Sequence, residues 1–299
     1  IFVLNAAGIT IDGFKFANMA HRTIDTYFNA DDFTIRNCIF TGDVNNYQGG
    51  AIQFGGGSAL HAHNFLFERN LMLIDGGYLL YLGHAMDNGT VRENKFNGDS
   101  VSFGPFGNRT GWLIEGNEFD GDVAGDGPYW GCEFNANLGD AVIRGNNVHR
   151  MSGGVGNISL VGGSILNNRF ADNAFGAFEL WGGEFGSVVS ANVAISGNAF
   201  AYNGTNGLNQ AYAIRLRPGS IDPSTIHVRN NCFTNLGAGA SPPIRQQSTI
   251  PIDAELNYWG TADPAKIVAL FTGGPADYDP WLTGVGFAGE ILFPSTDPV

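Results

Sequence analysis

One short pattern recurs along this sequence and limits the folds that the chain can adopt. It consists of an aliphatic residue, two variable residues, a fixed position, one variable residue and an apolar residue, as in 91–96 and 114–119. The fixed position recurs at intervals in the twenties and low thirties, at Phe14, Cys38, Asn70, Asn94, Asn117, Asn146, Asn168, Asn198, Asn231 and Asn257. A period of this size with variable insertions predicts a solenoid whose coils keep their strands and vary their loops.

Each coil is expected to contain two short strands. One precedes the fixed position, and the other lies about halfway round the coil, in segments such as 52–54, 101–103, 158–160, 178–180 and 214–216. Parallel stacking at ~4.8 Å per coil would bury a continuous core. The Asn at the fixed position is expected to adopt the left-handed conformation at a bend and to point its amide inward, where successive amides would form a ladder.

This register resembles the right-handed parallel β-helix repeat of the pectate-lyase-like superfamily, over roughly residues 1–260. The resemblance implies an all-β solenoid of about ten coils. The superfamily includes lyases, hydrolases, epimerases, phage spikes and non-catalytic surface proteins, so the fold alone leaves the function open.

The sequence predicts two regions in the chain: coils over residues 1–256 and a C-terminal closing segment over residues 257–299. The runs Asn-Tyr-Trp-Gly (257–260) and Tyr-Asp-Pro-Trp (278–281) resemble the closing segment of secreted bacterial and archaeal β-helix repeat proteins. Between them, Asp263 as N-cap and Pro264 at the first helical position predict a short helix. Its apolar residues would cover the open end of the stack. The abrupt N-terminal start, with no matching cap, leads us to expect further coils upstream.

Charged residues two positions before the fixed position alternate in sign over six coils, as Asp12, Arg36, Glu68, Arg92, Glu115 and Arg144. Neighbouring coils would place opposite charges side by side, so these residues are interpreted as a solvated ion-pair ladder rather than as catalytic groups.

The outward position of the halfway strands shows no such alternation, and it gives the candidate site. Its residues are expected to be Asp25, Gln53, Tyr81, Ser102, Glu133, Ser159, Glu179, Arg215 and Arg245. Glu133 and Glu179 would lie two coils apart, about 9–10 Å, near the ~6.5–9.5 Å separation of an inverting acid/base pair. The candidate substrate-binding residues around them are Tyr81, Arg109, Tyr129, Trp130, Trp181 and Arg215. The alternative is that both glutamates are ordinary exposed residues.

No required cofactor and no metal ligand set stands out. Asp120, Asp122 and Asp126 resemble the start of a Ca²⁺ loop and form a candidate Ca²⁺ site, but the remaining positions do not match an EF-hand. The three cysteines, Cys38, Cys132 and Cys232, would lie too many coils apart to pair, so three free thiols are expected.

Composition narrows the function further. A net charge of −13 argues against a nucleic-acid partner, and no apolar run is long enough for membrane insertion. Two hypotheses remain. One is an extracellular or cell-surface β-helix region of a larger surface or matrix protein, structural or binding a polysaccharide or cell-surface glycan. The other is a polysaccharide-degrading enzyme around coils four to seven. A glycoside hydrolase is favoured over a lyase because no Lys lies on the candidate face, although Arg215 and Arg217 remain alternative bases for a lyase. The sequence also leaves self-association open.

Overall fold

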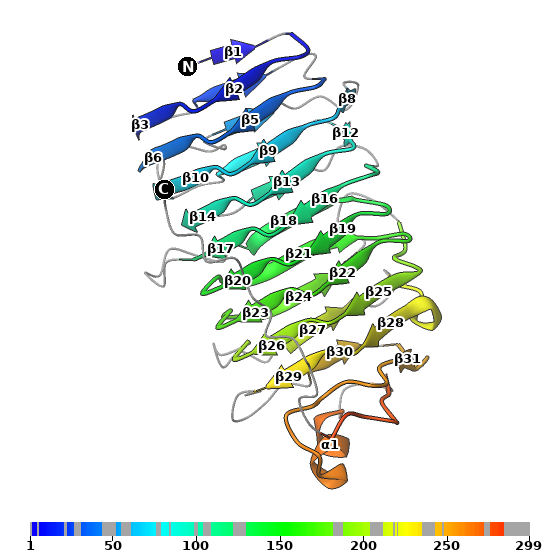
Figure 1. Ribbon diagram of the computed structural model, residues 1–299. Helices are drawn as coiled ribbons and strands as arrows, with labels where there is room; N and C mark the ends of the chain where they lie inside the picture. Colours follow the sequence, from blue (N-terminus) through cyan, green and yellow to red (C-terminus); the bar gives the residue numbers. More distant parts are fainter. Residues whose placement is uncertain are drawn as a thin grey trace.

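The strands of successive coils lie parallel and stack along the length of the molecule, as Figure 1 shows. The computed structural model describes residues 2–4, 6–20, 23–26, 31–43, 52–54, 61–75, 79–83, 85–98, 101–103, 109–121, 130–181, 188–203, 212–217, 219, 221–234, 243–246, 248–271 and 276–283. The fold is an all-β right-handed parallel β-helix of about ten coils with a short C-terminal helix, as the sequence predicts.

Three long parallel sheets make up the described coils. The eleven-stranded sheet contains β2 (Thr10–Asp12), β5 (Thr34–Arg36), β9 (Leu66–Glu68), β13 (Thr90–Arg92), β16 (Leu113–Glu115), β19 (Val142–Arg144), β22 (Ser164–Leu166), β25 (Val193–Ser196), β28 (Ile226–Arg229), β31 (Ile252–Asp253) and β32 (Ala276–Asp277). The nine-stranded sheet contains β3 (Lys15–Met19), β6 (Ile39–Asp43), β10 (Leu71–Asp75), β14 (Lys95–Gly98), β17 (Glu118–Asp120), β20 (Asn147–His149), β23 (Arg169–Ala171), β26 (Ala199–Ala201) and β29 (Cys232–Thr234).

The ten-stranded sheet carries the candidate face. It contains β1 (Phe2–Leu4), β4 (Ile24–Thr26), β7 (Ile52–Phe54), β11 (Leu80–Leu82), β15 (Val101–Phe103), β18 (Trp130–Asn137), β21 (Gly153–Ser159), β24 (Gly176–Leu180), β27 (Tyr212–Leu216) and β30 (Ile244–Gln246). A further parallel pair joins β8 (His61–His63) to β12 (Ala85–Asp87), and a 3₁₀ turn, η1, spans Pro223–Thr225.

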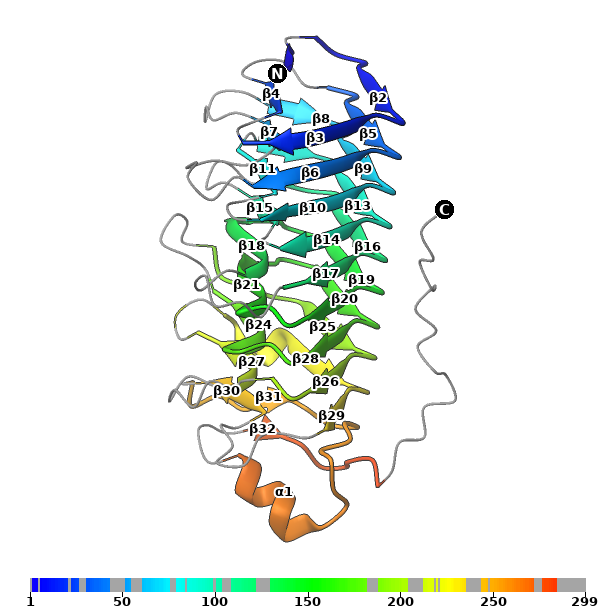
Figure 2. The ribbon, with the colours of Figure 1, turned by 90° about the vertical axis from the view of Figure 1, so that its left-hand side faces the viewer.

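Each typical coil therefore has three strands rather than the expected two. The additional strand follows the fixed position directly, and these strands make up the nine-stranded sheet that Figure 2 shows between the other two. The second apolar residue of the sequence pattern is the inward residue of this strand, as Phe96 in β14 and Phe119 in β17 illustrate. The repeat pattern contains only one inward residue of this strand, and a single apolar residue after a bend does not indicate a strand, which is why the sequence did not reveal it.

The asparagine ladder is confirmed. At each step the backbone N–H and the Nδ2 of one Asn both donate to the Oδ1 of the Asn in the next coil, at 2.8–3.1 Å. Each Nδ2 also donates to a carbonyl of the preceding coil, so the inward amides are satisfied inside the core. Eight buried residues form the ladder: Asn70, Asn94, Asn117, Asn146, Asn168, Asn198, Asn231 and Asn257.

The predicted backbone conformation of these asparagines is wrong. The left-handed residue is the one immediately before each fixed position: Gly13, Asn37, Arg69, Glu93, Gly116, Gly145, Asn167, Gly197, Asn230 and Leu256. The chain bends at this outer residue, between a strand of the eleven-stranded sheet and the next strand of the nine-stranded sheet. The Asn that follows can then keep an ordinary conformation and turn its amide inward.

The interior contains stacked columns of aromatic rings. Phe200 stacks on Phe233 with ring centroids 4.8 Å apart, and Phe233 stacks on Trp259 of the closing segment at 4.6 Å. Phe271 packs edge-on against Trp259, at 4.9 Å between centroids. The column thus continues from the coils into the C-terminal segment. The stacked rings also contribute favourable contact energy to the attachment of that segment.

The predicted C-terminal helix is present as α1 (Pro264–Leu270). Asp263 is its N-cap, and the carboxylate accepts a hydrogen bond from the Ala265 N–H at 3.0 Å. Ile267 is fully buried in the core, and Leu270 and Phe271 pack against it, so the helix covers the last coil. Within the described residues, no helix is long and apolar enough to cross a membrane.

The alternating charges of the eleven-stranded sheet pair as expected. Arg36 binds Asp12 at 2.9 Å, Arg144 binds Glu115 at 2.7 Å and Arg92 binds Glu68 at 2.6 Å, each between neighbouring coils. One detail differs from the prediction of a solvated ladder. The Glu68 side chain is only 3% exposed, because the exposed residue Arg69 contacts its other oxygen at 2.9 Å.

Candidate functional site

The ten-stranded sheet brings part of the predicted site together. Glu179 on β24 pairs with Arg215 on β27 in the strand register, and Arg215 pairs with Arg245 on β30. Glu133 belongs to β18, two strands before β24 in the sheet, so its separation from Glu179 by two coils is as expected. The side chains of Glu133 and Trp130, and all of Tyr129, lie outside the described residues.

One register position was predicted wrongly. Ser159 was expected between Glu133 and Glu179, but Gly156 pairs with Glu133, and Ser159 pairs with Asn137 further along the strand. An irregularity between Val155 and Ile158 in β21 shifts the register there. The short alternating segment 158–160 resembled a strand centre, whereas the structure has a longer strand with a Gly at the outward position.

Glu179 is enclosed by arginines on the outer side of the sheet. Its neighbours Phe178 and Leu180 point into the core, so alternation directs Glu179 outward. The side chain is nevertheless only 1% exposed, because Arg217 Nε donates to Oε1 at 2.5 Å and Arg215 NH1 lies 3.3 Å from the same oxygen. The carboxylate therefore serves as an anchor for two guanidinium groups.

Aromatic rings hold both guanidinium groups in place. The Arg217 guanidinium lies over the Trp181 ring, 4.0 Å from the centroid, and that of Arg215 lies 5.6 Å from the Tyr212 centroid. Burial, together with the nearby Glu179 carboxylate, raises the pKa of the Tyr212 hydroxyl far above its usual value, so this hydroxyl stays protonated. We call these five residues, Trp181, Arg215, Arg217, Glu179 and Tyr212, the aromatic–arginine cluster.

The other two described members of the predicted binding set lie elsewhere. Tyr81 on β11 is four strands away from β24 in the ten-stranded sheet, about 19 Å at the strand spacing. Its side chain is partly buried, which raises the pKa of the hydroxyl. Arg109 is fully buried and donates from NH2 to the Leu82 carbonyl at 3.0 Å. Burial lowers the pKa of Arg109 to about 10, and its guanidinium is not open to solvent.

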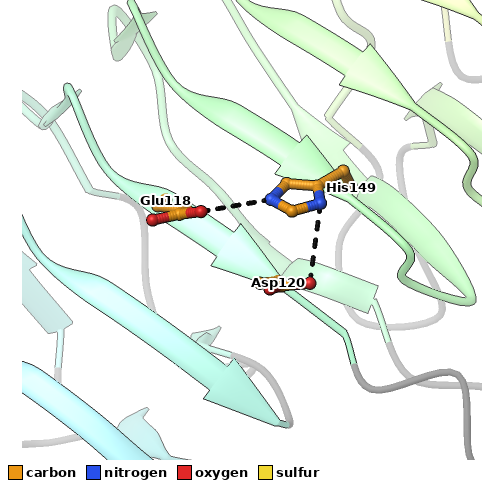
Figure 3. A group of neighbouring side chains, drawn as sticks. All are labelled: Glu118, Asp120 and His149. Carbon is orange, nitrogen blue, oxygen red and sulfur yellow. Dashed lines mark hydrogen bonds and ion pairs between the residues drawn. The ribbon is translucent and has the colours of Figure 1, made fainter. Parts of the chain in front are cut away.

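A second group of polar side chains lies on the outer side of the nine-stranded sheet and was not predicted. Figure 3 shows the imidazole of His149 between two carboxylates of the preceding coil. His149 Nε2 lies 3.3 Å from Glu118 Oε1, and Nδ1 lies 3.5 Å from Asp120 Oδ1. One ligand atom from each residue lies within 4.8 Å of the others, which is close enough to hold a metal ion. We call Glu118, Asp120 and His149 the histidine–carboxylate group.

Two cations border this group. Lys95 Nζ lies 3.1 Å from Glu118 Oε2, and Arg150 contacts both oxygens of Asp120, with Nε donating to Oδ1 at 2.7 Å. The sequence contained a signal for the group. Glu118 and Asp120 flank the inward residue Phe119 of one repeat, and His149 occupies the position of Asp120 in the next repeat. Recognising it requires the third strand of the coil, which the sequence did not reveal.

The candidate Ca²⁺ site cannot be assembled from the described residues, because Asp122 and Asp126 lie outside them and only Asp120 is placed. Cys38 and Cys232 are free thiols, as expected, and the Cys132 side chain also lies outside the described part. No protein-family model matches this chain, and searches of curated proteins and of solved structures find no match either. The case for a function therefore rests on the two sites themselves.

Proposed function

We propose that this chain is a β-helix region of an extracellular or cell-surface protein and that it binds a glycan at the aromatic–arginine cluster. The observation that carries the proposal is the contact between Trp181 and Arg217, two partly exposed side chains just beyond the ends of the neighbouring strands β24 and β27. A fixed aromatic ring provides an apolar face for sugar C–H groups, and a guanidinium provides donors for hydroxyl or carboxylate oxygens.

The charge of the cluster favours a glycan with acidic groups. Arg215 and Arg217 carry two positive charges, and Glu179 neutralises only one of them. The two guanidinium groups together offer ten N–H donors, of which the contacts to Glu179 use only a part. Their side chains are 19% and 30% exposed, so a ligand carboxylate could reach donors that already have a fixed orientation.

The same geometry argues for binding rather than catalysis. A general acid or base must reach the proton that it transfers, at about 2.6–3.2 Å. Glu179 is 1% exposed, and its Oε1 is already contacted by two arginines. We therefore expect no polysaccharide turnover by the unmodified chain, and Glu179→Gln should only weaken the hold of the cluster on its two arginines.

The test is a titration of the full chain with defined neutral and acidic oligosaccharides, measured by calorimetry, together with product sizing after incubation. We expect binding of an acidic oligosaccharide, at least about tenfold weaker in Trp181→Ala and Arg217→Ala. The matched control is Arg144→Ala, which removes an ion-paired arginine from the eleven-stranded sheet and should bind as the unmodified protein does. Equal affinity in the control and cluster variants, or defined cleavage products, would contradict the proposal.

A further inference from the structure

We propose that Glu118 and His149 bind a first-row divalent cation such as Zn²⁺, with Asp120 orienting the imidazole. This site is independent of the aromatic–arginine cluster and lies on a different sheet. Phe119 points into the core, so Glu118 and Asp120 both project outward from β17. Asp120 and His149 are direct neighbours in the register between β17 and β20, which places the ring over both carboxylates.

The argument starts from the two nitrogens of one ring. A neutral imidazole carries a single N–H, so it can donate to only one of its two carboxylate neighbours. If Nδ1–H points to Asp120 Oδ1, the lone pair of Nε2 faces Glu118 Oε1 across 3.3 Å. Two acceptors at this distance repel each other unless a positive charge lies between them. That charge is either a proton or a metal ion.

The dimensions suit a metal ion. Zn–N bonds of about 2.0–2.1 Å and Zn–O bonds of about 2.0–2.2 Å at tetrahedral angles place two ligand atoms roughly 3.3 Å apart. The observed Nε2 to Oε1 distance is 3.3 Å. An imidazole whose other nitrogen donates to a carboxylate is the usual arrangement of a metal-bound histidine, and Asp120 is in turn fixed by Arg150.

The donor set also selects among ions. Ca²⁺ takes 6–8 oxygen ligands, whereas the two proposed ligands are one imidazole nitrogen and one carboxylate oxygen. A mixed nitrogen and oxygen set favours Zn²⁺, Cu²⁺ or Ni²⁺. His149 and Glu118 are 17% and 25% exposed, so an ion can enter from solvent and complete its coordination with water.

Lys95 gives the proposal a distinctive consequence. It binds Glu118 Oε2 and leaves Oε1 facing the imidazole, so it holds the carboxylate in place but repels an incoming cation. Removing its charge should therefore strengthen ion binding, by about three- to tenfold at moderate salt. A purely structural network of ion pairs would show no such gain.

The experiment is a Zn²⁺ titration of the full chain by calorimetry, with the imidazole ¹⁵N signals followed by NMR. We expect one site that is at least about tenfold weaker in His149→Gln and Glu118→Gln, and tighter in Lys95→Met, with the His149 Nε2 signal shifting on binding. The matched control is His227→Gln, because His227 contacts a single carboxylate, that of Asp253, at 2.6 Å. Thermal melts establish that each variant is folded.

Any of these results would overturn the proposal: no Zn²⁺ binding by the unmodified chain, unchanged binding by folded His149→Gln, or loss of the same site in His227→Gln. Tighter binding of Ca²⁺ than of Zn²⁺ would also overturn it, since an oxygen-only site does not need the imidazole.

Discussion

Replacing Asn146 by Ala should cost a large share of the stability of this fold. The Asn146 side chain makes four hydrogen bonds inside the core. Its Oδ1 accepts from the backbone N–H and the Nδ2 of Asn117, both at 2.9 Å. Its Nδ2 donates to the Ile114 carbonyl and to Asn168 Oδ1, also at 2.9 Å.

The magnitude follows from the groups that the substitution leaves behind. The backbone N–H of Asn117 and one of its two Nδ2 hydrogens lose their acceptor, although Nδ2 still donates to the Val91 carbonyl. The Ile114 carbonyl loses one donor, while Asn168 Oδ1 keeps the backbone N–H of residue 146. Each buried group without a partner costs about 1–3 kcal/mol. Allowing for some entry of water, the free energy of unfolding should fall by about 3–6 kcal/mol, against a typical total of about 5–15 kcal/mol.

The assay is urea unfolding followed by circular dichroism, with Asn147→Ala as the matched control. Asn147 is the next residue, points outward, and accepts a hydrogen bond from Arg169 NH1 at 2.9 Å. Its loss should cost no more than about 1 kcal/mol. Asn146→Asp separates the hydrogen bonds from the volume, because it keeps the shape but places an acceptor opposite the Ile114 carbonyl. If both Asn146 variants unfold within about 1 kcal/mol of the control, the ladder is not a principal source of stability.

Three further substitutions test other parts of the fold. Cys38→Asn should extend the ladder by one coil and raise the free energy of unfolding by about 1 kcal/mol, measured by urea unfolding. The reason is that the Cys38 thiol already lies 3.7 Å from the Ile11 carbonyl that an amide would bind. A lower urea midpoint would show that the amide does not fit. Gly89→Ala should lower the melting temperature, since a Cβ at this position would overlap the Trp112 ring, and an unchanged melt would contradict that packing. Burial favours a higher pKa for Asp253, but hydrogen bonds from neighbouring arginine and histidine side chains outweigh it and hold the pKa below the usual value. Its ionised form therefore stabilises the fold above the unfolded-state pKa, and this contribution is lost as the pH falls through the lowered folded-state pKa. On the acid side of the unfolded-state pKa, the free energy of unfolding of Asp253→Asn should therefore depend less on pH than that of the unmodified chain.

The fold could be predicted from the sequence because every coil repeats the same physical requirement, a hydrogen-bonding partner for the inward amide. An inward amide is tolerable only if the next coil supplies its partner, so eight asparagines in phase specify the parallel stack. The charge pairs of the eleven-stranded sheet were predictable for the same reason, since they depend on register alone.

The candidate sites were harder to predict because they depend on features without a periodic signal. Counting along the repeat places Glu179 on the outer face, but only the structure shows that Arg217, just beyond the end of its strand, folds back to enclose it. The histidine–carboxylate group depends on β17 and β20, and each contributes only one inward residue to the repeat, which does not by itself indicate a strand. Arg109 shows the opposite difficulty, because it was predicted to bind substrate on the candidate face and is buried.

The ladder also has a consequence for how such a chain can change in length during evolution. Every ladder step uses the same bonds, although the sequence between two steps varies from 22 to 33 residues. Loss of residues 95–117, for example, would remove one whole coil, and Asn94 would then face Asn146, which is the present partner of Asn117. Whole coils can therefore be duplicated or removed without creating a new kind of interface, whereas a deletion of half a coil would leave an amide without a partner.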